Sequence, residues 1–132
     1  TVHGPFNAGG AITGPWGIAI DGNDHVWVAS STSHSVTQLC GVRTETCPPG
    51  LKTGDPITPS EGYIGGLQIV APIALDPAGN AWVGNGWNDT KAGFSKVPPE
   101  AQSTQFPAHT IVVFVGVAKP VRTPLIGPAK AQ

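Results

Sequence analysis

Two cysteines offer the clearest chemistry in this chain. Cys40 and Cys47 flank a short segment that is followed by two prolines and a glycine. Their close spacing favours a disulfide over a zinc site, which wants four ligands, and no His neighbours this loop. Redox catalysis is disfavoured because there is no Cys-x-x-Cys sequence. Free thiols in a reducing compartment are the alternative. We favour the disulfide, and with it a secreted, periplasmic or extracellular location.

Four histidines are scattered along the chain, at His3, His25, His34 and His109. His34 and His109 begin two segments that we predict to be equivalent strands, and His25 ends a turn. Equivalent placement would suit a metal ion or an acid–base pair. Exposed His at strand ends is the more ordinary interpretation. We therefore predict no catalytic residue, no metal site and no cofactor, and keep His25, His34 and His109 as candidate binding residues.

Tryptophans are the candidate aromatic platforms for a ligand. Trp27 and Trp82 recur at equivalent positions, so we predict that both are buried by packing between repeated units. Trp16 and Trp87 have no such counterpart, and Trp87 opens an irregular loop of the kind that carries recognition residues. We take Trp87 and Trp16 as candidate binding residues. Asn88 begins an Asn-x-Thr sequence, which fits the acceptor pattern for glycosylation.

A duplicated segment must position these residues. Residues 18–21 and 26–29 recur as 73–76 and 81–84, at a constant offset of 55 (18 to 73, 26 to 81). Alternating β-branched and aromatic residues predict paired strands, and the Asp-led Gly/Asn segments between them predict turns. The recurring Asp21 and Asp76 lack the alternating oxygen ligands of a calcium loop, so turn formation explains them better.

Further strands complete each repeated unit. We predict third strands at 35–39 and 110–115, and fourth strands at 56–58 and 120–123. Four short antiparallel strands per unit are typical of a β-propeller blade. The predicted fold is all-β and β-propeller-like, with two four-stranded antiparallel blades in an incomplete ring with long loops. A single domain spans 1–132, with blades at about 15–59 and 70–124, an insertion at 85–108 and an extended C-terminal tail at 119–132.

The repeat resembles a known family. Residues 14–21 (Gly-Pro-Trp-Gly-Ile-Ala-Ile-Asp), with the turn and strand up to residue 29, are similar to NHL-repeat β-propellers of the bacterial secreted branch, which are related to streptogramin-lyase-type propellers. The resemblance covers most of 4–84 and resumes at 110–127, like a C-terminal two-blade portion. It implies a propeller that binds proteins, RNA or small molecules. The lyases use a His base with a divalent ion, but their catalytic motif matches no position here.

Composition excludes several classes of function. Only 11% of the residues are charged, against roughly 25% in average proteins. The net charge of −1 and the lack of a basic run argue against nucleic-acid binding. No apolar stretch approaches the ~20 residues of a membrane-spanning helix. The 18 glycines and 14 prolines argue against long helices.

Two blades cannot close a ring, because propellers have typically about 4–8. The chain begins with Thr1 and contains no Met, so we expect either a removed N-terminal segment or a longer parent chain. The expected partners are further copies, in a ring or a filament, or the remaining blades of a longer precursor. The predicted function is a non-catalytic extracellular interaction or structural module with an unidentified ligand. The alternative is a fragment of a propeller lyase or hydrolase with a site at the blade-end loops.

Overall fold

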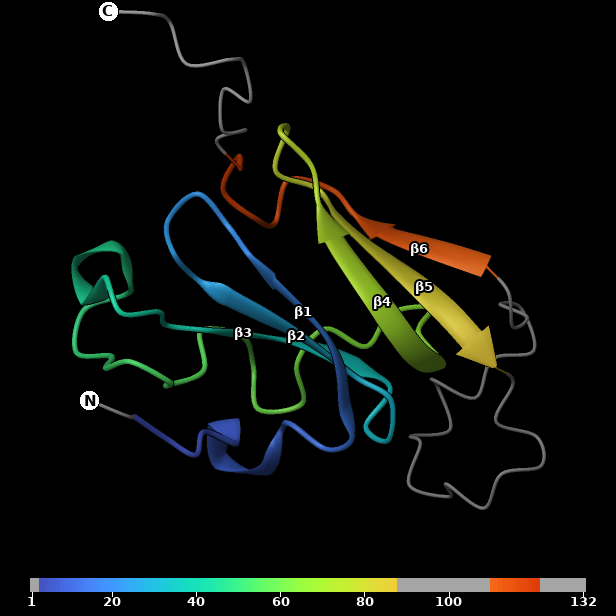
Figure 1. The fold of residues 1–132 in the computed structure, drawn as a ribbon, viewed down its shortest axis with the longest axis horizontal. Coiled ribbons are helices and arrows are strands. Elements are labelled where there is room, and N and C mark those ends of the chain that lie inside the picture. Colours follow the sequence, from blue (N-terminus) through green and yellow to red (C-terminus); the bar gives the residue numbers. More distant parts are fainter. Residues whose placement is uncertain (1–2, 88–109, 122–132) are drawn as a thin grey trace, which may run out of the picture.

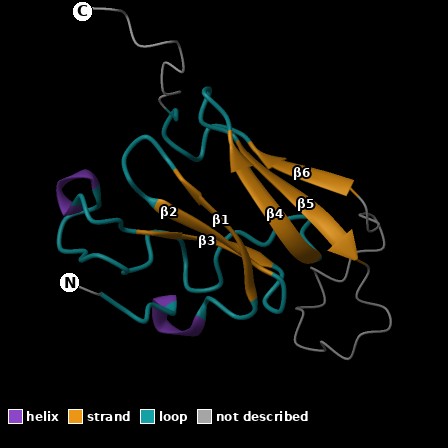
Figure 2. Ribbon diagram, viewed as in Figure 1, coloured by secondary structure: helices purple, strands orange, loops and turns teal. Residues whose placement is uncertain are grey.

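The computed structural model describes residues 3–87 and 110–121, and in them the fold is all-β. Two three-stranded antiparallel sheets have the orders β1-β2-β3 and β4-β5-β6, which we call the first and second sheet. The elements are η1 (Ala8–Gly10), β1 (Pro15–Ile20), β2 (Val26–Ser30), β3 (Ser35–Leu39), η2 (Thr44–Thr46), β4 (Ile69–Leu75), β5 (Ala81–Trp87) and β6 (Thr110–Phe114). In this part of the chain no helix has the length and apolar character needed to cross a membrane. Figure 2 shows that both helical elements are short turns outside the sheets.

The duplicated hairpins form as predicted. β1 pairs with β2 and β4 with β5, and the pairs closing each turn are Ile20 with Val26 and Leu75 with Ala81. In the first turn, the Oδ1 atom of Asp21 accepts the backbone N–H groups of residues 23 and 25 (2.8 and 3.1 Å). In the second, Oδ1 of Asp76 accepts those of residues 78 and 80 (both 2.9 Å). Asp side chains that bind nearby backbone N–H groups define such turns, so the predicted role of both residues is confirmed.

The core lies between the two sheets. Figure 1 shows that β4 is the strand of the second sheet nearest to the first sheet. Alternate residues of each strand face this interface, as strand geometry requires. The buried members are Trp27, Ala29, Val36, Leu67, Val70, Ala81, Val83 and Ala118. The strands approach so closely that a Cβ atom on Gly17 would lie 2.3 Å from the carbonyl oxygen of Ala71. The sheets are therefore stacked face to face.

The fourth strand predicted at 56–58 does not form as a regular strand. The chain from Gly54 to Tyr63 instead follows the free edge of β3 and makes isolated bridges at Pro56 and Tyr63. Its hydrogen bonds include Ile57 N–H to the carbonyl of Gln38 (2.7 Å). Pro56 has no N–H to donate, and a turn at 59–62 interrupts the pairing. The prediction of four-stranded blades is therefore not confirmed, although this edge of the first sheet is hydrogen-bonded.

The second predicted fourth strand, at 120–123, is not seen where the chain is described. Residues 120 and 121 belong to no strand, and 122–123 lie outside the described residues. The preceding segment passes between the two sheets: the backbone N–H of Ala118 donates to Gly79 O in the β4–β5 turn (3.0 Å), and Gly22 N–H in the β1–β2 turn donates to Lys119 O (3.2 Å). This segment thus links the two hairpin turns. β5 continues through Trp87, so the first residues of the predicted insertion are strand, and 88–108 lie outside the described part.

The exposure of Trp82 contradicts one prediction. Trp27 is fully buried, as expected, but 45% of Trp82 is exposed. The face of the first sheet that carries Trp27 is covered by the second sheet, whereas no described segment stacks on the face that carries Trp82. The prediction of equivalent burial is wrong, because equivalent positions within two sheets do not have equivalent neighbours outside them.

Candidate functional site

Each repeat holds its tryptophan with the aspartate of its own turn. The indole Nε1–H of Trp27 donates to Oδ2 of Asp21 (3.2 Å), and that of Trp82 donates to Oδ2 of Asp76 (2.9 Å). Both Asp oxygens therefore accept N–H groups and are engaged in structure rather than in a cation site. Sequence reasoning missed this bond. Its signal was the identical six-residue separation of Asp and Trp in both copies.

This bonding makes the second turn sensitive to acid. Backbone N–H donation by Asn80, with the Trp82 indole and the Asn80 amide, lowers the pKa of Asp76 from 3.8 to about 2. As pH falls from 3.8 to about 2, the unfolded chain binds a proton that the folded chain does not, so the stabilisation present above this window is lost. We expect Asp76→Asn to remove this part of the acid dependence. Urea unfolding of both proteins at several pH values measures it, and identical acid profiles would contradict the role of this carboxylate.

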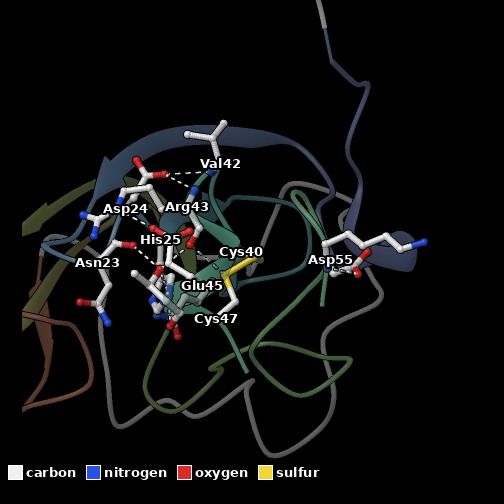
Figure 3. Close-up of a disulfide and its surroundings, with 12 residues drawn as sticks. Asn23, Asp24, His25, Cys40, Val42, Arg43, Glu45, Cys47 and Asp55 are labelled. Atoms are coloured by element: carbon white, nitrogen blue, oxygen red, sulfur yellow. Dashed lines mark hydrogen bonds and ion pairs between the residues drawn. A yellow bond between two sulfur atoms is a disulfide. The ribbon is translucent and has the colours of Figure 1, made fainter. Parts of the chain in front are cut away.

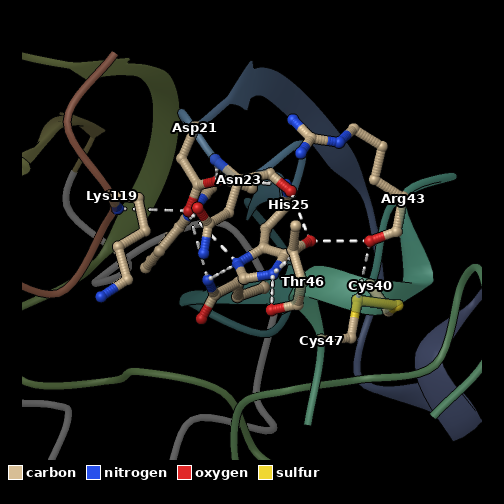
Figure 4. Close-up of polar contacts among 10 residues, drawn as sticks. Asp21, Asn23, His25, Cys40, Arg43, Thr46, Cys47 and Lys119 are labelled. Atoms are coloured by element: carbon tan, nitrogen blue, oxygen red, sulfur yellow. Dashed lines mark hydrogen bonds and ion pairs between the residues drawn. A yellow bond between two sulfur atoms is a disulfide. The ribbon is translucent and has the colours of Figure 1, made fainter.

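His25 is buried in a polar network behind the first turn (Figure 4). The amide nitrogen of Gln38 lies 2.9 Å from Nδ1 of His25, and Nε2 of His25 lies 3.1 Å from the carbonyl oxygen of Thr46. Because a backbone carbonyl can only accept, Nε2 donates to Thr46, while Nδ1 faces both the Gln38 amide and Oδ2 of Asp21 (3.4 Å). The network fixes the ring between β3 and η2. His25 is therefore held by structural contacts, and the interpretation of the histidines as exposed residues at strand ends is wrong for His25 and for His34, which are both buried.

The predicted disulfide is present between Cys40 and Cys47, with Cα atoms 5.7 Å apart (Figure 3). The loop it closes is tied to the β1–β2 turn. Oδ2 of Asp24 accepts the backbone N–H groups of Val42 and Arg43 (2.8 and 3.0 Å). The disulfide thus holds residues 40–42 beside the first sheet, where they line one side of an apolar groove.

We expect that the untreated protein is not alkylated, and that after reduction both Cys40 and Cys47 are alkylated. Opening the loop, which has a sequence separation of 7, should lower the free energy of unfolding by about 2.5 kcal/mol through added chain entropy. Intact mass with and without reductant tests the bond, and urea unfolding of the reduced, alkylated protein tests the energy. Two reactive thiols in the untreated protein would overturn both the bond and the inference of export.

The other predicted site residues do not converge. His34 is buried in the β2–β3 turn, and Trp16 lies exposed on β1. Trp87 is the last residue of β5, while His109 and Asn88 fall outside the described residues. Across residues 3–87 and 110–121, no three His, Cys, Asp or Glu side chains are grouped so as to hold a metal ion.

The candidate site is an apolar groove of about 670 Å³ on the outer face of the first sheet. Its floor comes from residues of β1 and β2 with Leu39 of β3, and its walls come from the N-terminal segment and the disulfide loop. The main apolar lining residues are Phe6, Ile12, Trp16, Ile18, Ile20, Val26, Val28, Leu39 and Val42. A pocket of this size with mostly apolar lining is typical of a binding site.

The most exposed part of the groove is β1. Trp16, Ile18 and Ile20 are 62%, 68% and 53% exposed. Such a run of large apolar side chains in contact with water marks an interaction surface. Of these residues only Trp16 was predicted as a binding residue. The signal for the other two was the period of two, which places 16, 18 and 20 on one face of the strand.

No family model, no curated protein and no solved structure matches this chain.

Proposed function

We propose that this protein is a non-catalytic extracellular interaction or structural module built from NHL-type blades. Its outer sheet faces stack against further blades, in a ring, a filament or a longer parent propeller. One observation carries the proposal: β1 on the outer face of the first sheet and the outer face of the second sheet present exposed apolar side chains at positions whose repeat counterparts lie in the interface between the sheets.

The outer face of the first sheet matches the inner face of the second. At the repeat offset, Ile18 and Ile20 correspond to Ile73 and Leu75. The two members of the second sheet are partly buried against the core between the sheets. The two members of the first sheet have the same kind of side chain in the same strand position, but they face solvent. A further sheet stacked on the groove would bury them in the same way.

The outer face of the second sheet matches the inner face of the first. Trp82 corresponds to Trp27 by the repeat offset. Ile111 corresponds to Val36, because Val36 pairs with residue 29 of β2 and Ile111 pairs with residue 84 of β5, which is the repeat counterpart of residue 29. Trp27 and Val36 are both fully buried. Ile111 is 71% exposed. Burial of such surface stabilises association by roughly 25 cal/mol per Å² before the losses of freedom on binding.

Two further features support the same proposal. The segment from Gly54 to Tyr63 lies at the edge of β3, where a blade's fourth strand would stand. The Cys40–Cys47 bond suits an oxidising compartment outside the cytoplasm. The lyase alternative gains no comparable support, because His25 and His34 are buried rather than presented at an open site.

The experiment is sedimentation of the purified chain across the micromolar range. We expect species heavier than 13.5 kDa that dissociate on dilution and resist added salt, because the exposed faces are apolar rather than charged. A compact 13.5 kDa species that does not change with concentration would refute stacking in a ring or filament of copies.

A further inference from the structure

On the basis of the proposed stacking function, we infer that the groove of the first sheet binds the outer face of the second sheet of another copy, head to tail. The occupant is thus a second copy of this chain. The two surfaces are the groove, represented by Ile18, Ile20 and Val28, and the outer face of the second sheet, represented by Trp82, Ile111 and Val113.

The chain already contains one example of this contact. Inside the molecule, the inner face of the first sheet, with Trp27 and Val36, packs on the inner face of the second, with Ile73, Leu75 and Val83. Shifted by the repeat offset, the groove residues Ile18, Ile20 and Val28 are the counterparts of those three residues of the second sheet. Ile18 and Ile20 are therefore the same half of the contact without its partner, whereas Val28 already packs against Ala8 and Ala11 at the edge of the groove.

The other half of the contact is the outer face of the second sheet. Trp82 and Ile111 are the counterparts of Trp27 and Val36, and Val113 replaces Gln38 at the position paired with the tryptophan. This replacement makes the exposed face more apolar than its buried counterpart. Ile111 and Val113 are 71% and 39% exposed, so the face is available to a partner.

The pairing must be heterologous. Two grooves meeting, or two Trp82 faces meeting, would have no counterpart in the internal interface, whereas a groove meeting a Trp82 face repeats it. Head-to-tail contacts either close into a ring or continue as a filament. The close approach of Gly17 to Ala71 also changes, because at the repeat offset it becomes Pro72 facing Trp16. This bulkier apolar pair keeps the two strands further apart than β1 and β4 are.

The test uses two variants, each of which blocks one face. Ile18→Glu places a charge in the groove, and Ile111→Glu places one on the outer face of the second sheet. Both side chains are highly exposed, so the substitutions should leave the fold intact, and thermal unfolding of each variant checks this. Ser60→Glu, on the exposed loop beside β3, is the matched control and should assemble as the wild type does.

Head-to-tail contact predicts one pattern of masses. Each blocked variant alone should be a 13.5 kDa monomer. An equimolar mixture should give a 1:1 dimer and nothing larger, because the Ile111→Glu groove accepts the intact outer face of the Ile18→Glu variant and both remaining faces are blocked. Both variants carry the same added charge, so charge attraction cannot cause the dimer. Lysine at both positions should give the same result and serves if a glutamate variant fails to fold.

Other outcomes overturn the inference in distinguishable ways. If the wild type assembles but the mixture stays monomeric, the head-to-tail pairing is wrong and the stacking function survives. A dimer formed by either variant alone would show contact between like faces. A wild type that stays monomeric would reject both the stacking of copies and this contact, and would leave the groove to a small apolar ligand.

Discussion

Replacing Trp27 by Ala should lower the free energy of unfolding by about 3–5 kcal/mol, as deletion of a fully buried aromatic side chain does. The ring has no exposed surface and stacks on Tyr63, with ring centroids 6.0 Å apart. Tyr63 in turn contacts Phe114 of β6, at 5.5 Å. The truncation therefore opens a cavity in the layer that joins the two sheets, and it also removes the indole donor from Asp21.

Trp82→Ala is the matched control, because it deletes the same side chain and the same Asp hydrogen bond in the other repeat. Trp82 is 45% exposed, so its loss should cost about 1 kcal/mol, within the usual range for partly exposed positions. Urea unfolding at concentrations low enough to prevent association compares the two. Equal losses would contradict the difference in burial between the two repeats. The same Trp82 variant should still weaken assembly.

Replacing Gly17 by Ala should cost about 1–3 kcal/mol by overpacking the interface between the sheets. The new Cβ atom would lie 2.3 Å from the carbonyl oxygen of Ala71 and 3.1 Å from the backbone nitrogen of Ile73. Both are backbone atoms, so no side-chain rotation relieves the clash. β1 and β4 must separate, and the core between the sheets loses contacts.

Gly65→Ala is the control for this substitution. A Cβ atom there would have no neighbour within 4 Å, so the change should stay within about 0.5 kcal/mol of the wild type. Both variants are compared by the urea midpoint and by near-ultraviolet circular dichroism of the buried tryptophan. If Gly17→Ala is as stable as Gly65→Ala, the two sheets do not approach as closely as described.

Short-range chemistry made much of the fold predictable. The hairpins at Asp21 and Asp76 follow from a turn-forming carboxylate between two alternating segments, and both formed in the expected places. The third strands predicted at 35–39 and 110–115 also formed, and the Cys40–Cys47 bond followed from two cysteines close in sequence. The hairpins and the disulfide depend on residues that are near one another in the chain, whereas β6 pairs with β5 over a longer separation, as Ala81 with Phe114. The family resemblance, the export and the roles of Trp87, His109 and Asn88 stay predictions.

The candidate site was predictable only in part. Trp16 was recognised because it is an unmatched tryptophan, but Ile18 and Ile20 were counted as ordinary strand residues. Nothing in β1 alone distinguishes an apolar face that is covered from one that is not. Likewise, the burial of His25 depends on Gln38 of β3 and on Thr46 of η2, a contact across 21 residues of chain.

The sequence by itself determined which residues pair within each sheet, because pairing depends on alternation, turn chemistry and the repeat. The tertiary structure decided which face of each sheet is buried. Trp27 and Trp82 occupy the same position in the repeat and make the same hydrogen bond to an Asp, yet only Trp27 has another sheet stacked upon it. Burial is a property of the neighbour that removes water from a side chain. For the inner face of each sheet, that neighbour is the other sheet of the same chain. For the outer faces, by our proposal, it is another copy.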